Sequence, residues 1–219
     1  MSELGDAVID AAEEARNIGA TMDCHLNMKS HINKITKGCY YHLRNIGRIR
    51  KNLTEDATKT LIQALVLSKI DGLNALLYGL PDNLIRKLQL VQNQAARMIM
   101  RLGRYEHITP AMQHLHWLPV SSRIEYKICM LVFKCLTNTA PVYLCDLIEM
   151  YDAGRSLRSN LNGMLVVKEA IGKTYGERAF SICAPKLWNR LPVHIREADS
   201  LDSFKRDLKT HLFRLAYGQ

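Results

Sequence analysis

The stretch that decides the fold is PDNLIRKLQLVQNQAARMIMRLG, residues 81–103. Its apolar residues recur at alternating intervals of four and three, which is the spacing of a buried helical face. They are Leu84, Leu88, Val91, Ala95, Met98 and Leu102. Pro81 and Asp82 favour a helix start here, and Gly103 favours a helix end. The stretch therefore predicts a helix that packs along one seam.

Two more helices are predicted upstream of this stretch. The first runs from residue 27 to about residue 50, because Ile32, Ile35, Cys39, Leu43 and Ile46 recur at helical spacing. The second is capped by Thr54, is apolar on almost every side, and runs to about Gly79 before Pro81 stops it. We therefore expect residues 27–105 to form a three-helix bundle with the second helix at its centre.

Two of these helices carry basic faces. The chain has no acid between Asp23 and Glu55, and the basic residues of the third helix fall close together on a helical wheel. Such stripes repel themselves unless an anion neutralises them, so they predict nucleic-acid contacts. The candidate residues are Arg44, Arg48 and Lys51 on the first helix and Arg97, Arg101 and Arg104 on the third. The alternative is that both stripes are simply solvated helix surfaces.

The rest of the chain predicts a smaller α+β region after a helical extension. Residues 106–150 read as helices, including one over 120–136, and Trp117 favours a core position over base stacking. A linker follows near residue 151, and residues 151–219 combine a hairpin between Leu165–Val167 and Ile171–Tyr175 with a last helix capped by Ser200. A turn is expected at Ala184 and Pro185. The fold class is mainly α, a helical bundle followed by an α+β region with a short β-hairpin.

Residues 1–26 read differently from the bundle. Residues 11–16 are helix-prone, and residues 18–22 suit a short strand or hairpin. An isolated hairpin is marginal in water, so we expect this segment to be frayed.

Net charge and hydropathy limit the classes of binding partner that the sequence favours. The 219 residues carry a net charge of +9, which favours polyanions, nucleic acid first and acidic membranes second. The most apolar stretch, residues 61–80, is interrupted by Lys69 and Asp71, which makes a membrane span costly. The N-terminus is acidic and lacks the apolar core of a signal peptide. We expect no membrane partner and an intracellular location, nuclear or cytoplasmic.

Catalytic and metal-binding signatures are missing from the sequence. It contains no Asp-Asp pair for two-metal chemistry, no Gly-rich phosphate loop and no hydrolase signature. Six cysteines occur without a Cys-x-x-Cys pair or a histidine at zinc spacing, so reduced, packed thiols are the expectation. We expect no catalytic residues, metal, cofactor or small-molecule substrate.

Four short sequence strings follow one another in a fixed order along the chain. They are RNIGATMD (residues 16–23), LQLVQNQAAR (88–97), LHWLPV (115–120) followed by Arg123 and Ile124, and TYGERAF (174–180) with APKLWNRLP (184–192). This series resembles the C-terminal third of the reverse transcriptase polyprotein of non-LTR retrotransposons, the jockey-like LINE elements. The resemblance spans about Arg16 to Phe213.

The resemblance implies a thumb and C-terminal region without its catalytic palm and fingers. In that family the thumb is a helical bundle that holds the template–primer duplex, and residues 1–26 would be the remnant of a β-element at the end of the palm. The implied partners are an RNA–DNA hybrid or duplex and the missing palm and fingers. Of the basic candidates, only Arg44 and Arg97 are supported by the resemblance itself. The alternative is a decayed or host-retained transposon fragment that acts as a helical protein-interaction module; Gly72, where relatives usually have an aromatic residue, suits that reading.

Overall fold

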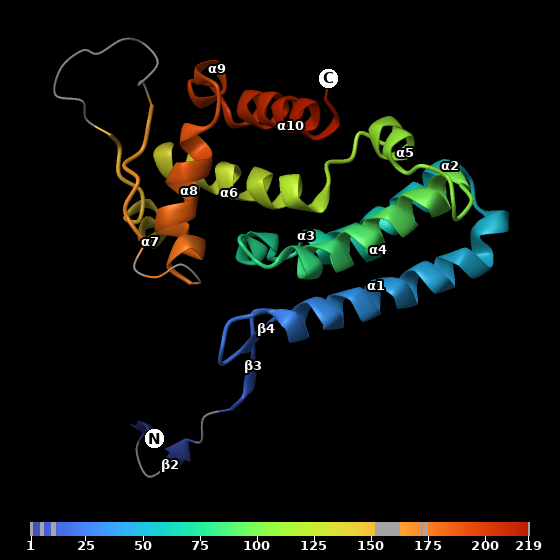
Figure 1. The fold of residues 1–219 in the computed structure, drawn as a ribbon, viewed down its shortest axis with the longest axis horizontal. Coiled ribbons are helices and arrows are strands. Elements are labelled where there is room, and N and C mark those ends of the chain that lie inside the picture. Colours follow the sequence, from blue (N-terminus) through green and yellow to red (C-terminus); the bar gives the residue numbers. More distant parts are fainter. Residues whose placement is uncertain are drawn as a thin grey trace. The chain divides into compact units, whose positions relative to one another are not determined.

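The computed structural model describes residues 2–4, 7–9, 12–151, 163–170, 172 and 175–218, with the backbone alone for 2–4 and 7–9. These residues are mainly helical with short antiparallel β-hairpins, which confirms the predicted fold class (Figure 1). The chain divides into two compact units. One comprises Met1–Leu73 and Leu80–Arg104, and the other comprises Asn74–Gly79 and Tyr105–Gln219.

The first unit is built around two long helices. Its helices are α1 (Lys29–Ile49), α2 (Glu55–Ile62), α3 (Ser68–Asp71) and α4 (Asp82–Met100), with a 3₁₀ turn at Arg50–Asn52 and a π-helical turn at Gln63–Leu67. The seam of α4 packs against α1 and α2. Leu84, Leu88, Val91 and Ala95 are buried as predicted, while Met98 and Leu102 are half-buried. Thr54 caps α2 as expected, because its side chain accepts the N–H of Ala57.

The second predicted helix is shorter than expected. It changes to a π-helical turn at Gln63 and ends at Asp71, because Gly72 takes an extended conformation and Leu73 turns left-handed with φ 58°. Glycine in a helix interior costs about 1 kcal/mol relative to alanine, so the helix ends easily there. A 3₁₀ helix, Asn74–Leu77, follows and belongs to the second unit. The prediction of one helix to Gly79 is therefore wrong.

Residues 14–23 form a β-hairpin, which agrees with the strand character of residues 18–22, whereas residues 14–16 are in a strand and not in a helix. Strands β3 (Glu14–Asn17) and β4 (Ala20–Asp23) pair antiparallel, and β4 contacts α1. The Asp23 carboxylate accepts the N–H groups of His25, Asn27 and Met28 and so holds the loop between β4 and α1. Desolvation raises the pKa of Asp23, but the backbone N–H bonds together outweigh it and lower the pKa below its ordinary value. Strands β1 (Ser2–Leu4) and β2 (Ala7–Ile9) form a second short hairpin.

The second unit packs its helices around α6. Its α-helices are α5 (Thr109–His114), α6 (Val120–Leu136), α7 (Val142–Cys145), α8 (Phe180–Asn189), α9 (Val193–Arg196) and α10 (Leu201–Tyr217), and a 3₁₀ turn spans Gly176–Arg178. Helices α8 and α10 both contact α6, where Phe133 stacks on Phe204 with ring centroids 4.4 Å apart. Trp117 is 4% exposed, which confirms its core position. Helix α6 has its predicted bounds, and Ser200 caps α10 through the N–H of Ser203.

Three predictions for this unit need correction or fall outside the described residues. Pro185 lies inside α8, so the predicted turn there is wrong. Leu165 forms an isolated antiparallel bridge with Met150, whereas its predicted partner strand lies largely outside the described residues, at 171, 173 and 174. The predicted linker also falls largely on undescribed residues, 152–162.

The C-terminal strings serve the packing of the second unit. The Trp188 indole donates to the Gly163 carbonyl at 2.7 Å, and Asn189 exchanges two hydrogen bonds with the backbone of Leu165. Arg178 donates to the Tyr78 carbonyl and packs over Gly79. These side chains tie loops to the unit's core, which explains why polar residues stand in otherwise apolar strings.

Candidate nucleic-acid interface

A basic hollow lies where the end of α4 meets α1 in the first unit. Its volume is about 520 Å³, and we call it the arginine hollow. It is lined by Gly47, Arg50, Gln94, Arg97, Met98, Arg101, Leu102 and Arg104. Half of these residues are arginines and none is acidic, so a set of positive charges gathers in one concavity. Such an arrangement favours a bound anion.

Arg50 is the arginine that the helical stripes miss. Its guanidinium donates to the carbonyls of Met98, Ile99 and Leu53 at 2.8–2.9 Å. The first two carbonyls belong to the last turn of α4, where a cation is favoured by the helix dipole. Arg50 therefore closes the end of α4 and contributes a fixed charge to the hollow.

Arg97 and Arg101 are positioned by the turn that ends α4. The Arg97 carbonyl accepts the N–H groups of Arg101 and Leu102, and the Arg97 side chain donates to the Gly103 carbonyl at 2.7 Å. Arg101 is left-handed, with φ 53°. The helix thus ends at Met100, three residues before Gly103, where the sequence predicted its end, and the turn brings Arg101, Leu102 and Arg104 to the hollow.

Of the two predicted basic stripes, only the one at the end of α4 lines the arginine hollow. Arg97, Arg101 and Arg104 all line the arginine hollow. Arg44, Arg48 and Lys51 are exposed and do not line the arginine hollow. Because α1 ends at Ile49, Lys51 lies in the following 3₁₀ turn and outside the helical register of Arg44 and Arg48.

The sequence contains one signal that points to Arg50. It stands in the acid-free basic run of residues 24–54, but it lies off the spacing that selects Arg44, Arg48 and Lys51. Arg50 comes to the hollow because it reaches the carbonyls of α4, which are 48 and 49 residues away in sequence. Local periodicity carries no information on such a contact.

The environment of the buried cysteines does not favour a reactive thiol, and the described side chains do not gather as a metal site. Burial raises the pKa of the Cys39 thiol to about 11 and of the Cys129 thiol to about 12, which keeps both protonated and unreactive at neutral pH. Within the described part of the chain, no group of three or more His, Cys, Asp or Glu side chains gathers as metal ligands would. None of the described helices has the length and apolar character needed to cross a membrane.

Comparisons with models of known protein families, with curated proteins and with solved structures give no match to this chain.

Proposed function

We propose that the chain is the thumb and C-terminal part of a LINE-type reverse transcriptase and binds nucleic acid through backbone phosphates. The observation that carries the binding proposal is the arginine hollow, with four arginines and no acid among its lining residues. The parentage rests on the fixed order of the four sequence strings. The chain has no catalytic role in this proposal, because its sequence lacks the paired aspartates of the polymerase reaction.

Binding would proceed by neutralising phosphates. Arginine guanidinium groups donate paired N–H bonds to phosphate oxygens, and each contact releases counterions from the nucleic acid. Phosphate contacts fix the position of a duplex without reading its bases. An RNA–DNA hybrid of any sequence is therefore the expected partner, as reverse transcription requires.

A salt titration tests this proposal. Fluorescence anisotropy of a labelled RNA–DNA hybrid should show log K falling against log salt with a slope of roughly −4 to −5 if about five phosphates are neutralised. Replacing Arg97 and Arg101 together with glutamine should flatten the slope by roughly two on every sequence. The matched control replaces Lys209 and Arg214 on α10, which are exposed, and removes the same charge. An unchanged slope in the Arg97 and Arg101 variant, or equal loss in the control, would contradict the proposal.

One observation favours the alternative, a helical protein-interaction module. Around α7, Val142 is 73% exposed, Tyr143 69% and Met150 52%, which is unusual for large apolar side chains. This alternative predicts weak hybrid binding and a flat salt titration. Replacing Tyr143 with serine is expected to leave hybrid binding unchanged under the proposed function.

A further inference from the structure

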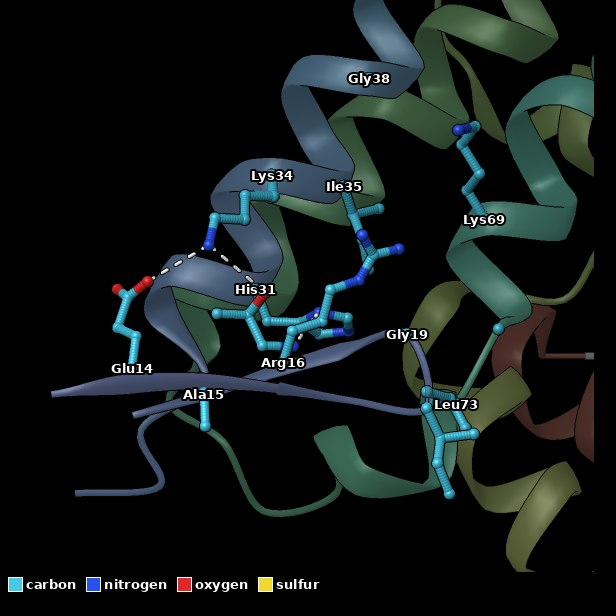
Figure 2. Close-up of a pocket in the computed structure, with 13 residues that line it drawn as sticks. Glu14, Ala15, Arg16, Gly19, His31, Lys34, Ile35, Gly38, Lys69 and Leu73 are labelled. Atoms are coloured by element: carbon cyan, nitrogen blue, oxygen red, sulfur yellow. Dashed lines mark hydrogen bonds and ion pairs between the residues drawn. The ribbon is translucent and has the colours of Figure 1, made fainter. Parts of the chain in front are cut away.

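A second hollow lies in the first unit between the β3–β4 hairpin, α1 and α3 (Figure 2). Its volume is about 740 Å³, and we call it the hairpin pocket. It shares no lining residue with the arginine hollow. Its walls combine cations, apolar side chains and glycines, so its chemistry differs from that of the arginine hollow.

The cations of the hairpin pocket outnumber its acids. Lys34 pairs with Glu14 at 3.2 Å, which neutralises one charge. Arg16, from the hairpin, and Lys69, from α3, have no acidic partner among the described residues that line the pocket. Figure 2 shows Arg16 rising from the hairpin, with Lys69 on the wall that α3 forms. Two cations thus face one space and favour a dianion there.

A buried donor completes the polar side of the pocket. His31 is 4% exposed, and its Nδ1 accepts the N–H of Thr21 at 3.3 Å. Nδ1 therefore carries no proton, and the neutral ring holds its proton on Nε2. This buried Nε2–H has no hydrogen-bond partner among the described residues. An unsatisfied buried donor is costly, so an acceptor that entered the pocket would gain a bond there.

The opposite side of the pocket is apolar and strained. Ile18 is 86% exposed in the hairpin turn with φ 45°, and Leu73 is 39% exposed with φ 58°. Bulky residues seldom adopt this conformation, and strain of this kind clusters at ligand sites. Gly38 leaves open space on α1, because an added Cβ would meet only the Lys69 Nζ at 3.9 Å. The apolar edge and the open wall leave room for a ring.

We infer that the hairpin pocket binds a phosphate monoester of nucleotide size, with the phosphate between Arg16 and Lys69 and the ring against Ile18 and Leu73. The volume of about 740 Å³ far exceeds the needs of phosphate alone and falls in the range of small-molecule sites. No motif in the sequence indicates such a ligand. The inference does not rest on the proposed function, because the two hollows share no residue.

The test titrates the full chain at low salt with adenosine monophosphate, inorganic phosphate and adenosine, by calorimetry and by NMR of the ¹⁵N-labelled protein. We expect saturable binding of the monophosphate, about tenfold tighter than phosphate, and no heat with adenosine. The His31 Nε2 resonance should shift as the site fills. A 5′-phosphorylated trinucleotide separates the two sources of this chemistry: tighter binding than the mononucleotide assigns the pocket to strand ends, and equal binding assigns it to free nucleotides.

Matched variants locate the site. Arg16→Gln and Lys69→Gln should each weaken monophosphate binding by about five- to tenfold. Lys37→Gln removes the same charge from an exposed position on α1 that does not line the pocket, and should leave binding unchanged. All three positions are exposed, so thermal melts should agree with the wild type. Absence of saturable binding, phosphate binding as tight as the nucleotide, or equal loss with Lys37→Gln would overturn the inference. The Arg97 and Arg101 variant should keep monophosphate binding.

Discussion

The last helix of each unit is followed by a different residue in the same backbone conformation. Helix α4 of the first unit ends at Met100 and is followed by Arg101 with φ 53°, whereas α10 of the second ends at Tyr217 and is followed by Gly218 with φ 69°. Glycine adopts this conformation without cost, and an arginine is strained there. The first unit therefore accepts strain to place a cation at the end of a helix.

The same contrast extends along the described chain. The first unit holds Ile18, Leu26, Met28, Leu73 and Arg101 at positive φ, all bulky residues. In the second unit, the non-glycine residues at positive φ are His116 and Asn138, types that tolerate this conformation. Three of the strained residues, Ile18, Leu73 and Arg101, line one of the two hollows. Part of the strain in the first unit therefore lies where its cations gather.

The largest expected effect is the loss of stability when a core side chain of the second unit is removed. Trp188→Ala should lower the free energy of unfolding by about 3–5 kcal/mol, because it leaves a cavity against Phe204 and removes the bond to Gly163. Urea denaturation followed by circular dichroism measures the change. The control, Tyr175→Ala, removes an exposed aromatic residue and should change stability by less than about 0.5 kcal/mol. A loss below about 1 kcal/mol for Trp188→Ala would contradict the packing role.

A smaller effect on stability is expected when the residues that follow α4 and α10 are exchanged. Arg101→Gly should raise the free energy of unfolding by about 1 kcal/mol, because it relieves a left-handed residue, while it weakens binding to the hybrid. Gly218→Arg is the reverse change and should lower the free energy of unfolding by about 1 kcal/mol, because it places a side chain on a left-handed residue. An added Cβ there meets nothing within 4 Å, so no clash adds to this effect. Denaturation curves and anisotropy measure the two properties. Loss of stability in Arg101→Gly would show that the side chain, and not the strain, dominates.

A third change relieves the hairpin turn. Ile18 and Gly19 both have positive φ, as in a type I′ turn, where asparagine followed by glycine is the favoured pair. Ile18→Asn should therefore stabilise the first unit by about 0.5–1 kcal/mol, because the isoleucine is 86% exposed and loses little burial. Thermal melts measure the gain, with Ile18→Val as the β-branched control that should gain nothing. Equal melting of Ile18→Asn and wild type would show that Ile18 is not strained.

The smallest expected effect concerns pH. Burial and then the nearby Lys34 charge lower the pKa of His31 below its ordinary value of 6.5. The unfolded state therefore binds a proton that the folded state resists, so stability falls as pH drops below about 6.5. Urea melts at pH 7 and pH 5 should show a smaller pH-dependent loss in His31→Gln than in the wild type. The pKa of His211 is also lowered, but this histidine is present in both proteins, so its contribution cancels when their pH-dependent losses are compared. An identical loss in both proteins would exclude His31 as a source.

The sequence alone predicted local features well and long-range features poorly. It located α6 at Val120–Leu136 and the caps Thr54 and Ser200, because periodicity and capping depend on residues within a few positions. It placed Pro185 in a turn and extended the second helix to Gly79, because packing decides whether a helix continues through an unfavourable residue.

By itself, the sequence determined a basic, mainly helical chain whose third helix ends in clustered arginines. Charge and hydrophobic periodicity are properties of neighbouring residues and need no fold to be read. That Arg50 joins Arg97, Arg101 and Arg104 in one hollow follows from the tertiary structure alone, because a guanidinium from the turn after α1 reaches carbonyls at the end of α4. The packing likewise buries His31 against the β3–β4 hairpin, where its Nε2 donor has no partner among the described residues, since burial depends on which elements pack together.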